Sequence, residues 1–84
     1  MAYLQTDIFL MMQTMKQWER VLWHLEKYGR ITNKDCHDLY GIRHAPSVIR
    51  VLRDKDYKII NERKYEKNRF GEKVFYDEYV LQKR

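Results

Sequence analysis

Apolar residues recur at helical spacing through the first half of the chain, and this pattern predicts three helices separated by glycines. Residues three and four positions apart share one face of a helix, so such a stripe marks the buried face. The first stripe consists of Trp18, Val21, Leu22, Leu25 and Tyr28. Thr14 followed by Gln17 matches a capping box, and a helix ends easily at Gly29. We therefore expect the first helix to begin at Thr14 and to end at Gly29.

A second, shorter helix is predicted after a brief extended link at Arg30 and Ile31. Thr32 with Asp35 forms another cap signature, and Gly41 ends the element after about Tyr40. Its inner face is expected to consist of Cys36, Leu39 and Tyr40. A helix of about two turns is not stable alone, so tertiary packing must hold it.

The third helix is expected over about residues 44–55. Pro46 suits its first turn, where a missing N–H costs nothing, and Ile42 is expected to fill the core at the preceding turn. The buried stripe is predicted to be Ala45, Val48, Ile49 and Leu52. The exact start of this helix stays open around His44, Ala45 and Pro46.

The last third of the chain changes to the alternating period of β-strands. Apolar and polar residues alternate from Tyr57 and again toward Leu81, and the turn formers Asn68 and Gly71 lie between the two runs. The step from Tyr76 to Tyr79 is odd, which predicts a β-bulge near residues 77–78. We expect a two-stranded hairpin with a long basic tip at residues 66–72.

The start of the chain carries large apolar residues at roughly helical spacing. Residues 1–13 are expected to form an extension, helical from about Thr6, and residues 14–84 the domain proper. The extension could be a disordered leader, but its apolar residues favour packing on the core, on a second copy or on another protein. Its candidate contact residues are Leu4, Ile8, Met11 and Met12.

The predicted order of helix, link, helix, glycine turn, helix and hairpin describes a helix-turn-helix followed by a hairpin. The stretches VLWHLEKYGRIT (21–32), DLYGI (38–42), VIRVLRDKDYKI (48–59) and NRFGEKVFYDEYVL (68–81) carry a resemblance. They resemble the winged helix-turn-helix proteins common in bacteriophage and prophage genomes, over about three quarters of the chain. The resemblance implies an α+β winged helix-turn-helix fold and DNA binding.

The distribution of positive charge along the chain favours a polyanionic partner. The 84-residue chain has a net charge of +5. Residues 41–65 hold seven Lys and Arg against three Asp and Glu, which leaves +4 in that stretch. A local basic excess of this kind is the electrostatic footprint of a nucleic-acid-binding surface.

Candidate DNA contacts follow from the third helix, which would enter the major groove. Off its apolar stripe, the residues expected near base edges are Arg43, His44, Ser47 and Arg50, with Arg53 placed for phosphate. Contacts to the DNA backbone are expected from Thr32, Asn33 and Lys34, and contacts from the hairpin tip from Lys67, Asn68 and Arg69. Several have alternatives: Arg43 and Ser47 as helix caps, His44 as the N-cap or a surface residue, Arg50 on a solvated helix face or in an ion pair with Asp54, and Lys67 and Arg69 in an ordinary polar loop.

The sequence offers little for catalysis, metal or cofactor. Cys36 is the only cysteine, and His24, His37 and His44 show no paired spacing with it. Residues 1–15 lack the basic region of a signal peptide, and no apolar run approaches a membrane span. We therefore expect a cytoplasmic, non-enzymatic protein without cofactor or metal.

Two functions remain open at this level. The first is double-stranded DNA binding by a small phage-type transcription regulator or accessory protein, with the helix at residues 44–55 in the major groove. The second is a protein-interaction module on the same scaffold, such as a phage-encoded inhibitor of a host defence or host enzyme. RNA ranks below both, because the sequence shows no evident stacking platform. A homodimer through residues 1–15 is compatible with either.

Overall fold

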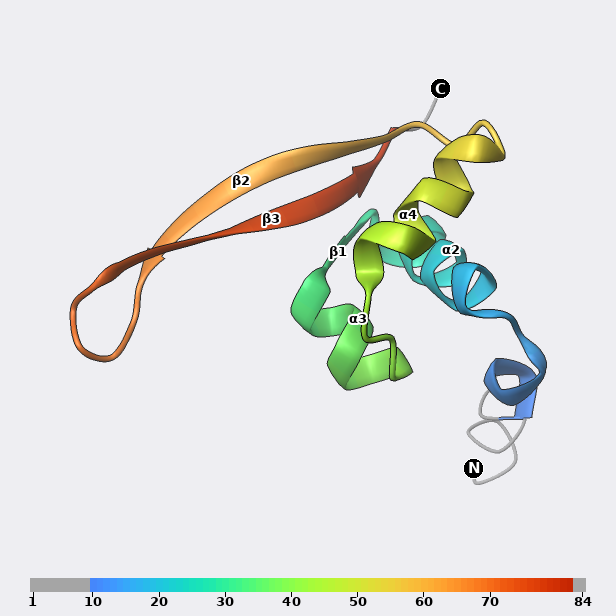
Figure 1. Ribbon diagram of the computed structural model, residues 1–84, viewed down its shortest axis with the longest axis horizontal. Coiled ribbons are helices and arrows are strands. Elements are labelled where there is room, and N and C mark those ends of the chain that lie inside the picture. Colours follow the sequence, from blue (N-terminus) through green and yellow to red (C-terminus); the bar gives the residue numbers. More distant parts are fainter. Residues whose placement is uncertain (1–9, 83–84) are drawn as a thin grey trace.

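The computed structural model describes residues 10–82. Its elements are α2 (Gln17–Tyr28), β1 (Arg30–Thr32), α3 (Asn33–Tyr40), α4 (Ala45–Asp54), β2 (Ile59–Lys67) and β3 (Lys73–Leu81). Residues 10–14, which precede them, are helical as well. The three helices gather beside the base of the hairpin formed by β2 and β3, and the hairpin projects beyond them (Figure 1). The predicted α+β architecture is confirmed.

The start of α2 corrects the sequence prediction. The helix begins at Gln17, after Lys16 in extended conformation, and not at Thr14. The Glu19 carboxylate accepts a hydrogen bond from the backbone N–H of Lys16 at 2.8 Å, which satisfies one free donor of the first turn. The Thr14 hydroxyl instead donates to the carbonyl oxygen of Met11 at 2.9 Å, because Thr14 ends the preceding helical segment.

The cap of α3 is confirmed. The Asp35 N–H donates to the Thr32 hydroxyl at 3.0 Å, and the Thr32 N–H donates to the Asp35 carboxylate at 3.2 Å. The helix ends at Gly41, whose φ of 66° lies in the left-handed region. That conformation places the following Ile42 in the core, 1% exposed, as predicted.

The prediction that Leu39 lies on the inner face of α3 is wrong. Its side chain is 59% exposed. Cys36 is fully buried, and Tyr40 is half-buried against His24 of α2. At about 100° per residue, Tyr40 lies about 40° to one side of Cys36 and Leu39 about 60° to the other. The contact with α2 is on the Tyr40 side, so Leu39 is turned to solvent.

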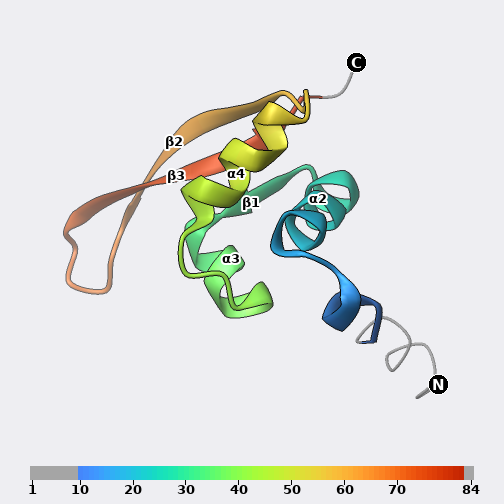
Figure 2. The ribbon, with the colours of Figure 1, turned by 45° about the vertical axis from the view of Figure 1, so that its right-hand side comes forward.

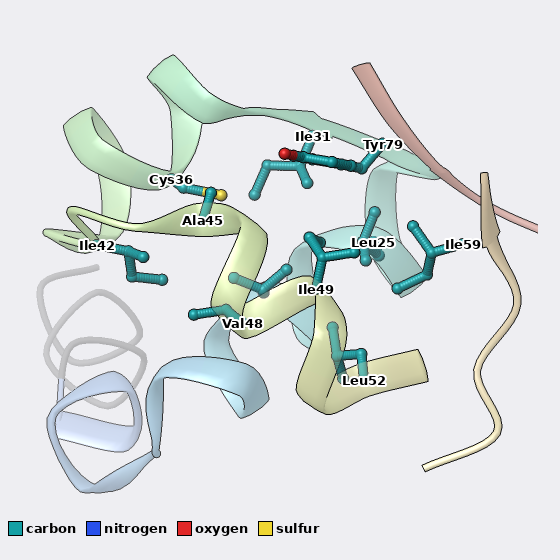
Figure 3. Packing of buried hydrophobic residues seen from close by; sticks show 11 residues of the cluster. Leu25, Ile31, Cys36, Ile42, Ala45, Val48, Ile49, Leu52, Ile59 and Tyr79 are labelled. Carbon is teal, nitrogen blue, oxygen red and sulfur yellow. The ribbon is translucent and has the colours of Figure 1, made fainter. Parts of the chain in front are cut away.

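α4 uses the whole of its predicted stripe for the core. Ala45, Val48, Ile49 and Leu52 are all at most 5% exposed, and Figure 3 shows them facing side chains from α2, β1 and β2. Pro46 occupies the second helical position after the N-cap His44, so its missing N–H breaks no helical hydrogen bond. The remaining core residues are Val21, Leu25, Ile31, Cys36, Ile42, Ile59 and Tyr79.

The sheet has three strands in the order β1-β3-β2, all antiparallel. The link predicted as merely extended is a true strand, with Ile31 opposite Tyr79. Both of these side chains are buried, so β1 fastens the base of the hairpin to the helices. Figure 2 shows β1 running beside β3, with α4 over the sheet.

The hairpin contains no bulge, contrary to the prediction from its alternation. Its register runs without interruption from Ile59 opposite Leu81 to Lys67 opposite Lys73. The odd step arises because Tyr79 is in the core, whereas Tyr76 lies outside the core and is 38% exposed. Burial therefore sets the pattern only at the base of the hairpin.

Candidate nucleic-acid interface

The start of α4 presents an exposed polar face opposite its buried stripe. Arg43, Ser47 and Arg50 are all exposed. Within residues 10–82, neither Arg43 nor Arg50 has a hydrogen bond or ion pair with another side chain, and Arg50 does not pair with Asp54. Both guanidinium groups are thus available to an external acceptor.

His44 and Ser47 have roles within the helix itself. His44 is the N-cap, and its Nδ1 accepts from the backbone N–H of Ser47 at 3.3 Å. The Ser47 hydroxyl also forms a hydrogen bond with this nitrogen. The capping alternative for His44 is therefore present in the structure, and its contact with bases stays a prediction.

Arg53 joins α4 to the hairpin. Its Nε and Nη2 donate to the carbonyl oxygen of Ile59 at 3.0 and 2.8 Å, and Nη2 also donates to Asn61 Oδ1 at 2.8 Å. Bonds from a charged donor to a backbone carbonyl are strong. Arg53 thus positions the hairpin relative to α4, and its phosphate contact stays a prediction.

The start of α3 and the hairpin enclose a cleft. Its volume is about 540 Å³, and it is lined by Thr32, Asn33, Lys34, Glu66, Phe75, Tyr76 and Asp77. The Thr32 side chain is engaged in its cap, whereas Asn33 and Lys34 are exposed. The structure therefore brings residues predicted for the DNA backbone beside the hairpin.

At the hairpin tip, Asn68 builds the turn. Its Oδ1 accepts from the N–H groups of Phe70 and Glu72 at 2.9 and 3.0 Å, and its Nδ2 donates to Glu72 Oε1 at 3.1 Å. Lys67 and Arg69 are exposed, and Arg69 lies 5.8 Å from the centre of the Phe70 ring. The two cations are available at the tip, whereas Asn68 is occupied.

The predicted contact residues of the extension are only partly visible. Leu4 and Ile8 lie outside the described residues. Met11 is 41% exposed, and the carbonyl oxygen of Met12 accepts from Arg20 Nε at 2.7 Å, which ties this segment to α2. A cleft of about 550 Å³ lies beside Met12, lined also by Trp23, His24, Tyr28, Arg30, Asp35, Leu39 and Tyr40.

The sequence reasoning missed the exposed rings of the hairpin. Tyr65, Phe70 and Phe75 are 67%, 78% and 61% exposed, and Tyr65 lies opposite Phe75 in the register. Strict alternation along both strands predicts this pairing. The predicted bulge obscured this pairing, because a bulge between Phe75 and Tyr79 would shift the register of the tip relative to the base of the hairpin.

Two titratable groups lie inside the helical body. His24 Nδ1 and the Tyr40 hydroxyl are 2.6 Å apart. Burial lowers the pKa of His24, and burial with the nearby Asp35 raises the pKa of the Cys36 thiol to about 11. Cys36 therefore stays a neutral thiol near pH 7.

In the described part of the chain, no cluster of three or more His, Cys, Asp or Glu side chains is arranged to hold a metal ion. No helix there has the length and apolarity needed to cross a membrane.

Three helices, a tight glycine turn before the third, and a hairpin packed on them define a protein of the winged helix-turn-helix class. The chain belongs to the family described as winged helix-turn-helix domain, whose pattern matches residues 16–84. Comparisons with curated proteins and with solved structures gave no match.

Proposed function

We propose that this chain binds double-stranded DNA with the first turns of α4 in the major groove. The observation that carries the proposal is the division of α4 into two faces. The apolar face is buried in the core, whereas Arg50 on the other face and Arg43 in the turn just before the helix are exposed and have no side-chain partner among residues 10–82. Membership of the winged helix-turn-helix family supports the same function.

The chemistry of this face suits base edges. The major groove is about 12 Å wide and admits one helix, and Arg pairs with guanine through two parallel hydrogen bonds. In this proposal Arg43 and Arg50 read bases, and Ser47 serves either base. The positive end of the α4 dipole also attracts phosphate.

The other elements supply sequence-independent contacts. We assign Asn33, Lys34, Lys67 and Arg69 to the phosphate backbone, because they are exposed around the cleft or at the hairpin tip. The molecule would serve as a small regulator or accessory protein of the phage type, without catalysis of its own.

The proposal is tested by titrating the protein into a labelled random-sequence duplex and following anisotropy over a salt series. We expect micromolar affinity that falls steeply with salt, because each neutralised phosphate releases counterions. Arg43→Ala/Arg50→Ala should weaken binding about tenfold. Lys27→Ala is the control, because it removes one positive charge from α2, where Lys27 lies over the Trp23 ring and not on the proposed DNA-binding face.

If Lys27→Ala weakened binding as much as Arg43→Ala or Arg50→Ala alone, the loss of affinity would come from the lower net charge and not from contacts at α4. Absence of binding at low salt would refute the DNA proposal.

A second candidate function is contact with another protein chain. The observation in its favour is the cleft beside Met12, where Leu39 and Tyr28 are 59% and 58% exposed. Contact with a second copy predicts concentration-dependent sedimentation that Leu39→Asp abolishes. A monomer at every concentration would contradict a homodimer through this surface, leaving an inhibitor-like role to be tested with a specific partner.

A further inference from the structure

The far half of the hairpin has two chemically different faces. Side chains alternate along a strand, and directly paired residues share a face. We call one side the aromatic face, which consists of Arg63, Tyr65, Lys67, Lys73, Phe75 and Asp77. The opposite face consists of Glu62, Lys64, Glu66, Val74, Tyr76 and Glu78.

Charge separates the same way as the rings. The aromatic face holds three cations and one carboxylate, a net charge of +2. The opposite face holds three carboxylates and one cation, a net charge of −2. A ligand attracted by a positive potential therefore meets the side that carries the exposed rings.

The rings form a platform of two inclined planes. Tyr65 and Phe75 have centroids 6.3 Å apart and ring planes at 51° to each other, and the Arg63 guanidinium lies 4.5 Å from the centre of the Phe75 ring. Arg63 is held there by a 3.1 Å hydrogen bond to Asp77. This face is the one that carries Ile59 and Tyr79 into the core at the base of the hairpin, so the platform continues from the helical body without being covered by it.

We propose that the aromatic face binds unpaired bases of a DNA strand by stacking, with Lys67 and Lys73 on the phosphates. This inference rests on the proposed DNA-binding function and extends it to a site that the recognition helix does not use. Aromatic rings beside cations bind unpaired strands because every base has a flat face. In a duplex those faces are covered by neighbouring base pairs, and the minor groove, about 6 Å wide, offers only base edges.

The test compares three 20-base-pair duplexes in the anisotropy assay: blunt, with a 3′ tail of six thymidines, and with a 3′ tail of six abasic nucleotides. The two tails carry equal phosphate charge and differ only in bases. We expect the thymidine tail to bind about fivefold or more tighter than the abasic tail, the lower end of the effect of one stacked base. Tyr65→Leu/Phe75→Leu should remove this preference, and Tyr65→Phe should retain it.

Tyr76→Leu is the matched control, because it removes a ring from the opposite face of the same hairpin. A cross-strand aromatic pair also stabilises a hairpin, so the test includes a signal that a structural role does not change. A 2-aminopurine placed in the tail should lose fluorescence on binding, and Tyr65→Leu/Phe75→Leu should prevent this loss. Circular dichroism checks that each variant is folded.

The outcomes separate this inference from the proposed function. Equal affinity for the two tails, with binding still dependent on Arg43 and Arg50, overturns the stacking site and leaves duplex binding intact. A preference for the thymidine tail that persists in Tyr65→Leu/Phe75→Leu also overturns the stacking site, and a protein ligand for the aromatic face would then be the next hypothesis. No binding to any of the three DNAs refutes both.

Discussion

At the scale of single residues, His24 shows how burial and a polar partner define a side chain's protonation. Burial raises the pKa of Tyr40 to about 12, so its hydroxyl keeps the proton beside His24 Nδ1, with which it forms a hydrogen bond of 2.6 Å. The imidazole also contacts the rings of Tyr28 and Tyr40, with centroids 4.7 and 5.5 Å away. The Tyr40 hydroxyl can pair with either form of the ring, so burial of the imidazole is what favours neutral histidine.

A pH dependence of stability follows. Burial lowers the pKa of His24 below its ordinary value of 6.5 in the folded chain, so the unfolded chain binds the proton first as pH falls. The contribution of neutral His24 to the free energy of unfolding is therefore complete above pH 6.5. It is lost as the pH falls through that value toward the lower pKa of the folded chain. The free energy of unfolding, measured in urea from pH 8 to pH 5, should decrease across this window.

His24→Gln should flatten that decrease, because the amide accepts from Tyr40 without titrating. His37→Gln, which replaces an exposed histidine, should leave it in place. A profile unchanged by His24→Gln would assign the pH dependence to other groups.

At the scale of elements, α4 depends on its cap as well as its stripe. The backbone N–H of Ser47 has no helical acceptor and is satisfied by His44. The same turn carries Arg43 and Ser47, so loss of the cap would loosen the geometry of the proposed base contacts.

His44→Ala is therefore expected to lower the free energy of unfolding by about 1 kcal/mol. His44→Asn should restore most of it, because asparagine is among the preferred N-cap residues. Urea denaturation measures both variants. An equal loss in the two would argue that the imidazole acts by packing and not as the hydrogen-bond acceptor.

The same scale shows what the sequence can predict. The stripe of α4 and the cap at Thr32 were predictable because both are local patterns tied to one helix. The start of α2 was not, because the Thr14 hydroxyl bonds backward to Met11 as readily as a cap bonds forward. A strand of three residues has no measurable period, so the pairing of β1 had to come from the structure.

The sequence predicted which residues belong to the candidate site, but not which of their side chains are free to contact DNA. The exposure of Arg50 followed from the helical period, and Arg43 was recognised as a cation just before the buried stripe begins. The engagement of Arg53 with Ile59 depends on the placement of the hairpin, which no local pattern encodes. Asn68 was correctly recognised as a turn former, and the structure adds that its side chain holds the loop closed.

At the scale of the whole molecule, a packed body carries a hairpin that is supported only at its base. Near the body, β3 pairs with β1 on one side and β2 on the other. From Asp77 to the tip, β3 pairs only with β2, and the side chains of the far half are largely exposed. Figure 1 and Figure 2 agree that this half reaches beyond the helices.

Hydrogen exchange should report this division. We expect amides in residues 63–67 and 73–77 to exchange about tenfold or more faster than those of residues 59–61 and 79–81, because local opening there exposes no core. Uniform protection along the hairpin would show that it opens only together with the body.

The two faces of α4 also bear on how such a protein changes over generations. The side chains that hold the helix are Ala45, Val48, Ile49 and Leu52. Arg43 and Arg50 take no part in that packing, and exchanges at exposed positions usually alter stability by less than about 0.5 kcal/mol. Under the proposed function, descendants of this chain can therefore acquire new target preferences through these two positions while the inherited scaffold stays untouched.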